Sequence, residues 1–204
     1  MERVSEGTVV RHWLALERAK HDRDLDGPPP DDVSDRAALD ELLTFKPGAA
    51  AFVWRDAPVE WYRLDLTREE FDDLHVVPGP DGLLWRALAA DGTVRGCAER
   101  IADGEADRLR AETRVDVPYV LERRRLLSER DEFREPLVLS TRRGCVPRFV
   151  ADGNHRAVAL ALALLDGRPY TPQPAYLGVG ANPVFRPLTE RLCGVARSIS
   201  SFVR

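Results

Sequence analysis

The pattern of apolar and polar residues predicts an amphipathic helix at the start of the chain, over residues 6–20. A loop is expected at 21–32, because five aspartates and three consecutive prolines would break any regular element there. Ser34 can cap a short helix that ends near Leu43, before the Pro-Gly pair at 47–48. The first part of the chain is therefore expected to be helical.

The next segment has the pattern of β-strands. Residues 51–54 and 59–66 are rich in β-branched and aromatic side chains, and the second run alternates polar and apolar positions. Thr67 and Glu70 have the spacing of a capping box, which should open a short helix that ends near Leu74. We expect two strands and then one short helix.

Turn signals dominate the middle of the chain. Prolines and glycines cluster at 78–82, and the Asp-Gly pair at 91–92 is a strong two-residue turn signal. A β-hairpin with strands at 83–89 and 93–97 fits these signals. A helix over 98–102 competes with the hairpin for part of the stretch.

The pattern of residues 105–133 is helical and heavily charged, and Pro118 is expected to separate two helices there. In the last third of the chain, the residue pattern predicts a strand (136–140), a turn (141–145), a strand (148–151), an apolar helix (155–165), a strand (174–178) and a closing helix (188–203). This order indicates a mixed α/β or α+β domain. We place that domain at 49–204, preceded by an N-terminal helical extension and linker at 1–48.

Composition narrows the class of protein. The chain has 204 residues, of which 44% are apolar and 31% charged, as expected for one folded domain. Its longest apolar run, 157–165, is about half the length of a membrane helix, so no membrane span is expected. The N-terminus lacks the pattern of a secretory signal, and the three cysteines are odd in number and widely spaced. These features favour free thiols and a cytoplasmic protein.

Charge is distributed unevenly along the chain. The net charge is −4, yet residues 136–204 carry 9 basic and 3 acidic side chains, a net of +6. This basic third favours an anionic ligand, either a phosphate or a nucleic acid. Of the 30 basic residues only Lys20 and Lys46 are lysines, and we interpret the excess of arginine mainly as codon bias.

One junction between a strand and a helix combines several chemical groups, in the run Asp152-Gly153-Asn154-His155-Arg156. Unpaired N–H groups at a helix N-terminus bind anions, and Gly153 would let a ligand approach the backbone closely. His155 and Arg156 would add charge-assisted donors to phosphate oxygens. Asp152 could accept a proton from a hydroxyl group or hold a metal ion bridged to phosphates.

Two further arginines, Arg142 and Arg143, lie in the predicted turn before this junction and could close over the same ligand. In a purely structural alternative, Asp152 or Asn154 caps the helix. Two cationic side chains in a first helical turn oppose the helix dipole unless an anion offsets them, which favours the binding site.

Residues 137–178, which include Phe-Val-Ala-Asp-Gly-Asn-His-Arg-Ala, resemble the core of the ParB/sulfiredoxin-like fold. In that superfamily the junction binds nucleotide phosphates, and residues 59–74 would supply the opening strand and helix. Sulfiredoxins have a nucleophilic cysteine at the position of Asn154, so reduction of sulfinic acids is not expected here. ParB partition proteins carry Gly-Glu-Arg-Arg and a helix-turn-helix segment that this chain lacks, so a role in partition is not expected either.

The motif is most similar to the Asp-Gly-His-His-Arg of ADP-dependent free serine kinases, with Asn154 as the one difference. This resemblance implies that Asp152 and His155 are catalytic and that residues 153–156 hold phosphates. Those kinases also use an upstream glutamate, for which the candidates are Glu60, Glu69 and Glu70.

The leading hypothesis is transfer of a phosphoryl group from a nucleotide (ATP, ADP or CTP, with magnesium) to a small hydroxyl-bearing substrate. The alternative is a ParB-like module that acts on nucleic acid, as a nuclease or a DNA-binding accessory protein. A third hypothesis is a nucleotide sensor without turnover. The histidines and cysteines show no metal-ligand spacing, and Trp54, Trp61 and Trp85 lie in apolar patterns typical of a core.

Overall fold

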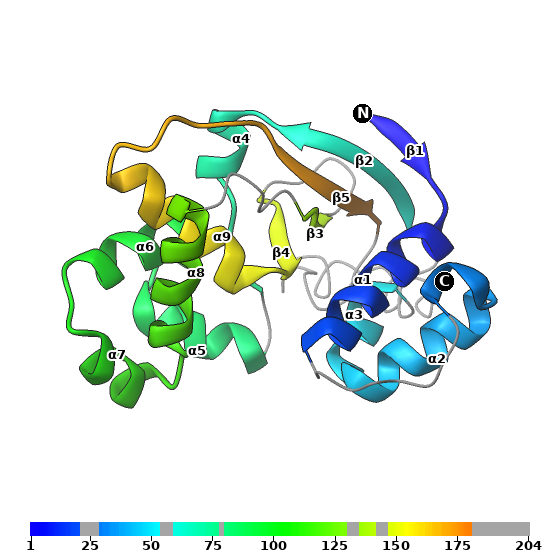
Figure 1. The fold of residues 1–204 in the computed structure, drawn as a ribbon, viewed down its shortest axis with the longest axis horizontal. Helices are drawn as coiled ribbons and strands as arrows, with labels where there is room; N and C mark the ends of the chain where they lie inside the picture. The colour runs from blue at the N-terminus through cyan, green and yellow to red at the C-terminus, as the bar shows by residue number, and fades with distance from the viewer. Residues whose placement is uncertain (21–28, 54–58, 78–79, 130–134, 142–146, 181–204) are drawn as a thin grey trace, which may run out of the picture.

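In the part of the chain that the structure describes, five strands form one mixed sheet with helices on both faces (Figure 1). The structure is a computed structural model, and the residues that it describes are 1–20, 29–53, 59–77, 80–129, 135–141 and 147–180. Among these residues, none of the helices has both the length and the apolar character needed to cross a membrane.

The elements follow one another in a mixed order. The strands are β1 (Glu2–Val4), β2 (Glu60–Leu66), β3 (Leu137–Thr141), β4 (Phe149–Asp152) and β5 (Gln173–Val179). The helices are α1 (Glu6–Lys20), α2 (Asp35–Phe45), α3 (Ala50–Val53), α4 (Arg68–Asp72), α5 (Pro80–Leu88), α6 (Val94–Ala102), α7 (Ala106–Thr113), α8 (Val117–Glu129) and α9 (Asn154–Leu165), with short 3-10 turns η1 (Pro30–Asp32) and η2 (Pro47–Ala49).

The strands lie in the order β1-β2-β5-β3-β4. β3 and β5 are parallel, with Leu139 opposite Leu177, and every other neighbouring pair is antiparallel. Helix α9 connects the edge strand β4 to the central strand β5, so its N-terminus lies at the end of β4 (Figure 1).

Successive side chains along the central strands point to opposite faces of the sheet, so the apolar core has one part on each face. Leu137 and Leu139 pack with α5–α9 on one face, whereas Val138 between them packs with α1 and α2 on the other. Tyr176 and Ala151 also face α1 and α2. Residues 1–48 and the rest of the chain therefore share one sheet, through the pairing of β1 with β2, and one apolar cluster.

Several predicted elements are confirmed. Helix α1 covers 6–20 as expected, and the Ser34 hydroxyl accepts from Ala37 N at the start of α2. Strand β2 is present, and Thr67 and Glu70 form the capping box of α4. In the last third, β3, β4, α9 and β5 follow the predicted order. The closing helix predicted at 188–203 lies outside the described residues.

Two β-strand predictions are wrong. Residues 50–53 form the short helix α3, and the predicted hairpin is the helix pair α5 and α6. The Asp-Gly pair connects two helices because Asp91 accepts from Thr93 N, and the Thr93 hydroxyl then accepts from Gly96 N and caps α6. The turn predicted at 78–82 is wrong from Pro80 onwards, where α5 begins.

The charged helical segment divides nearly where expected. Helix α7 ends at Thr113, and Arg114 then adopts a left-handed conformation with φ 63°. Helix α8 begins at Val117, so Pro118 lies in its first turn, where a missing N–H costs no helical hydrogen bond.

Candidate functional site

A cavity of about 790 Å³ opens at the N-terminus of α9. One side of the cavity is formed by the ends of α1 and α2, the other by α5 and α8, and residues 151–156 lie at its wall. Its size lies in the range of small-molecule sites, which is about 300–1,000 Å³. The site therefore depends on segments from both ends of the chain.

The N-terminus of α9 has no side-chain cap. Gly153 is the N-cap residue with φ 97°, and neither Asp152 nor Asn154 caps the helix, so the structural alternative is wrong in this respect. A Cβ at Gly153 would lie 2.6 Å from Leu137 Cδ2 and 2.9 Å from Arg156 Nη2, so glycine is required here. The first N–H groups of such a helix have no intrahelical acceptor and favour a bound anion.

Asp152 is 2% exposed and is surrounded by three cationic groups. Lys46 Nζ donates to Asp152 Oδ1, Lys20 Nζ lies 3.5 Å from the same oxygen, and Arg156 Nη2 donates to Oδ2 at 3.2 Å. Burial alone would raise the pKa of Asp152, but Lys46, Lys20 and Arg156 together lower it well below its usual range. Asp152 is therefore an ionised group that anchors cations.

Glu17 joins the same cluster from α1. Glu17 is 5% exposed, and its carboxylate lies 2.8 Å from Lys20 Nζ and 3.4 Å from Lys46 Nζ. The two lysines of the chain therefore meet at two buried carboxylates, Glu17 and Asp152. We call these four residues the lysine cluster. The interpretation of the arginine excess as mainly codon bias stays a prediction, whereas both lysines of the chain have buried ion-pair partners.

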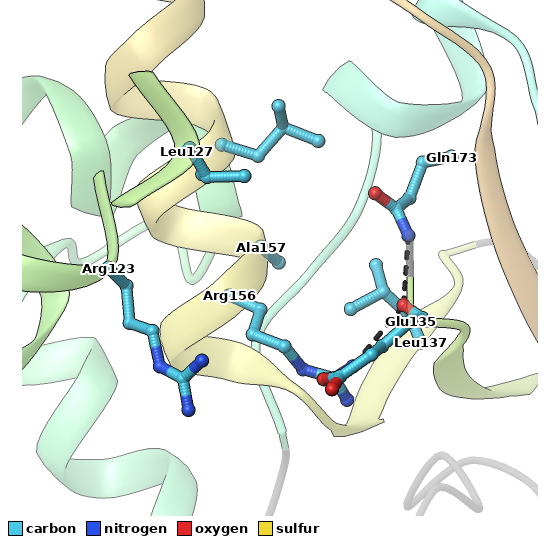
Figure 2. A pocket seen from close by; sticks show the side chains of 8 residues that line it. Arg123, Leu127, Glu135, Leu137, Arg156, Ala157 and Gln173 are labelled. Atoms are coloured by element: carbon cyan, nitrogen blue, oxygen red, sulfur yellow. Dashed lines mark hydrogen bonds and ion pairs between the residues drawn. The ribbon is translucent and has the colours of Figure 1, made fainter. Parts of the chain in front are cut away.

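The Arg156 guanidinium points back toward the start of β3 (Figure 2). Besides Asp152, it donates to Glu135 Oε2 at 3.1 Å and to the carbonyls of Glu135 and Pro136 at 3.2 and 3.4 Å. Gln173 donates to the same Glu135 carbonyl at 3.1 Å. These contacts make Arg156 a link between α9, β3 and Asp152. The sequence predicts instead that the Arg156 guanidinium binds phosphate oxygens.

Asn154 also has a structural role. Its Oδ1 accepts from Val77 N at 2.9 Å, and its Nδ2 donates to the Val150 carbonyl at 3.1 Å. The side chain thus joins the segment before α5 to β4. Its contribution to a bound phosphate is therefore expected to come from the backbone N–H.

His155 lies between two aromatic side chains. Its ring centroid is 5.0 Å from that of Trp85 and 5.3 Å from that of Tyr119, both in edge-to-face geometry. Burial lowers the pKa of His155 to about 4, against opposing and smaller effects of Asp116 and Asp152. His155 is therefore neutral at pH 7, so the cationic donor predicted from the sequence is a neutral imidazole.

The other predicted residues lie away from the cavity. Glu60 accepts from the Tyr62 hydroxyl on β2, and Glu70 belongs to the capping box of α4 and pairs with Arg148 at 2.8 Å. Glu69 is exposed in α4. None of these three glutamates lines the cavity, whose carboxylates are Glu17, Asp116, Glu135 and Asp152. Arg142 and Arg143 lie outside the described residues.

Eight further charged or aromatic residues line the cavity that the motif in the sequence does not indicate. These are Glu17, Lys20, Lys46, Trp85, Asp116, Tyr119, Arg123 and Glu135. The one signal available in the sequence was the rarity of lysine. Trp85 is in the core as predicted, at 6% exposure, yet its ring also contributes to the cavity wall.

Within the described part of the chain, no group of three or more His, Cys, Asp and Glu side chains is placed to hold a metal ion. Comparison with protein-family models, with curated proteins and with solved structures finds no match to the chain. The functional conclusion therefore depends on the geometry of the cavity.

Proposed function

We propose that the protein binds a nucleotide with magnesium in this cavity and transfers a phosphoryl group to a small hydroxyl-bearing molecule. One observation carries the proposal: the uncapped N-terminus of α9 and both lysines of a chain with 30 basic residues line the same cavity. Helix N-termini bind anions through their free N–H groups, and lysine ammonium groups bind phosphates as point charges.

The lysine cluster supports phosphate binding in a specific way. An ammonium group has three N–H donors, so Lys46 and Lys20 can each keep a bond to a carboxylate and still donate to a phosphate oxygen. Glu17 and Asp152 hold the two ammonium groups in place before a ligand arrives. Such pre-organisation reduces the entropy lost when the ligand binds.

Asp152 acts in this proposal as a positioning residue. Its lowered pKa makes it a weak base, and its oxygens are occupied by cations. Phosphoryl transfer tolerates a weak base, because catalysis comes mainly from alignment and charge stabilisation in a loose transition state. A magnesium ion bound to the phosphates could take a ligand from one of the cavity carboxylates, since magnesium needs only one or two of them.

We also propose that β3, β4, α9 and β5 form the core of a ParB/sulfiredoxin-like domain. The support is the order strand, strand, helix, strand, with Asp152 and Gly153 at the turn into the helix. The nucleic-acid alternative stays a prediction, because six of the nine basic residues in 136–204 lie outside the described residues.

The proposal is tested by incubating the purified protein with MgATP, MgADP or MgCTP and a panel of small alcohols, hydroxy acids and hydroxyl-bearing amino acids. Phosphorus NMR should show loss of one nucleotide and appearance of a phosphate monoester with one class of acceptor. Consumption of no nucleotide would contradict transfer. If a nucleotide raises the melting temperature without being consumed, the protein is a sensor and not a transferase.

A further inference from the structure

We propose that Trp85, Tyr119 and His155 form the binding site for the base of the nucleotide. We call these three side chains the aromatic wall. The inference rests on the proposed function and adds to it, since it says which part of the ligand each side of the cavity recognises. All three side chains line the cavity.

The aromatic wall and the lysine cluster lie on opposite sides of the same helix end. Trp85 comes from α5 and Tyr119 from α8, whereas the two lysines come from the ends of α1 and α2. Figure 1 shows α1 and α2 on one side of β4, and α5 and α8 on the other. A nucleotide has the same division, with a flat aromatic base at one end and anionic phosphates at the other.

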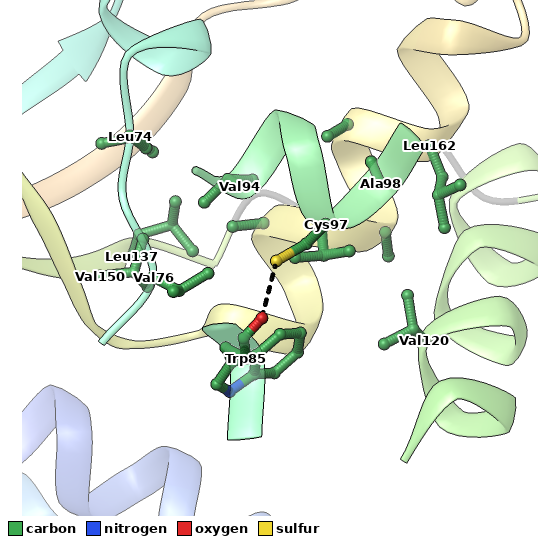
Figure 3. Close-up of a cluster of buried hydrophobic side chains, with 14 of the residues drawn as sticks. Leu74, Val76, Trp85, Val94, Cys97, Ala98, Val120, Leu137, Val150 and Leu162 are labelled. Atoms are coloured by element: carbon green, nitrogen blue, oxygen red, sulfur yellow. Dashed lines mark hydrogen bonds between the residues drawn. The ribbon is translucent and has the colours of Figure 1, made fainter. Parts of the chain in front are cut away.

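The core holds Trp85, the buried member of the aromatic wall. Cys97 Sγ donates to the Trp85 carbonyl at 3.6 Å, and apolar side chains including Val76 and Val94 pack around this contact (Figure 3). Trp85 is 6% exposed, so the core fixes its ring, whereas Tyr119 is 37% exposed and is the more accessible of the two. The Arg123 guanidinium lies 5.0 Å from the centroid of the Tyr119 ring and donates to its hydroxyl, so a base would share this ring with Arg123. A base would therefore stack mainly on Tyr119, with the fixed edge of Trp85 beside it.

His155 supplies the polar group that such a site needs. Its ring nitrogens have no hydrogen-bond partner among the described residues, although the side chain is half-buried. A neutral imidazole has one donor and one acceptor, which matches the mixed donor and acceptor edge of a nucleobase. Burial lowers the pKa of His155, and Lys20 and Lys46 act in the same direction, whereas Asp116 and Asp152 oppose it without reversing it. A base would satisfy this half-buried polar group.

The experiment compares ligands with and without a base. Binding of MgATP, MgADP, MgCTP and magnesium tripolyphosphate is measured by calorimetry on the wild type and on Tyr119→Leu, Tyr119→Phe and Tyr62→Leu. Tyr62 is a half-buried tyrosine on β2 that does not line the cavity, and it serves as the control. Melting temperatures confirm that each variant is folded.

The wild type should bind the best nucleotide more tightly than tripolyphosphate. Tyr119→Leu should weaken nucleotide binding by roughly 5- to 150-fold, the range of measured stacking contributions, and leave tripolyphosphate binding unchanged. Tyr119→Phe keeps the ring and should bind nucleotide nearly as the wild type does, as should Tyr62→Leu.

Two other outcomes are distinguishable. Equal affinity for nucleotide and tripolyphosphate, unaffected by Tyr119→Leu, would overturn the base site and leave the phosphate site standing. Absence of binding for every ligand would overturn the proposed function itself.

Discussion

Replacing Asp152 by asparagine is expected to lower the free energy of unfolding by about 3–5 kcal/mol, the range measured when one partner of a buried ion pair is removed. Asp152 is 2% exposed, and its carboxylate neutralises Lys46, Lys20 and Arg156. An asparagine has nearly the same shape but no charge, so it would leave positive groups close together with one buried carboxylate, Glu17. Urea unfolding followed by circular dichroism measures the change.

The matched control is Asp166→Asn at the end of α9. Asp166 pairs with Arg124, but its side chain is 50% exposed, so the loss should be less than about 1 kcal/mol. Comparable losses for Asp152→Asn and Asp166→Asn would show that the buried cluster does not stabilise the fold as described.

The contribution of Asp152 to the free energy of unfolding should also decrease as the pH falls. The pKa of Asp152 is lower in the folded protein than in the unfolded chain, so the unfolded chain binds the proton first as the pH falls. The stabilisation is fully present above the ordinary pKa of about 4 and decreases below it. The difference in stability between the wild type and Asp152→Asn should therefore shrink below pH ~4.

Replacing Lys46 by methionine is expected to weaken nucleotide binding by about 10- to 100-fold, the range for loss of one hydrogen bond to a charged group. Lys46 is the less exposed of the two lysines and lies against both Asp152 and Glu17. Methionine fills a similar volume without the ammonium group. Lys20→Met should weaken binding less, because the Lys20 side chain is 42% exposed and its field is screened by water. Calorimetric titration with the magnesium nucleotides measures both changes.

Arg95→Met provides the control for loss of one positive charge. Arg95 lies on α6, is 55% exposed and pairs with Glu99 four residues along the helix. Its removal should change the affinity by less than about twofold, because a charge exposed to water acts weakly at long range. If Lys46→Met and Arg95→Met have the same affinity for nucleotide, the lysine cluster does not bind phosphate. Melting temperatures separate this result from loss of the fold.

Much of the fold could be predicted from local patterns. Local apolar runs predict β3, β4, β5 and α9. Thr67 and Glu70 predict the start of α4, because a capping box depends on only a few neighbouring residues. The hairpin prediction failed because an Asp-Gly pair suits any tight turn. Whether it joins strands or helices depended on Thr93, whose hydroxyl caps α6.

The sequence predicts only the part of the site whose residues follow one another along the chain. Residues 152–156 were found because strand, glycine and helix follow one another, but Lys46 is 106 residues from Asp152 along the chain. No local pattern specifies a contact at that separation. The roles of Asn154 and Arg156 were likewise hidden, because their partners Val77 and Glu135 lie on other segments. The one compositional signal at the site is the rarity of lysine, since Lys20 and Lys46 are the two lysines of the chain.

The same rarity makes the central claim directly measurable. In protein labelled with carbon-13 at the lysine ε-carbon, the two lysines give two side-chain signals, and both lysines lie in the cavity. If the cavity binds nucleotide phosphates, both signals should shift and saturate together as MgATP, MgADP or MgCTP is added. If neither signal moves with any of the three nucleotides at millimolar concentration, the cavity is not a nucleotide site.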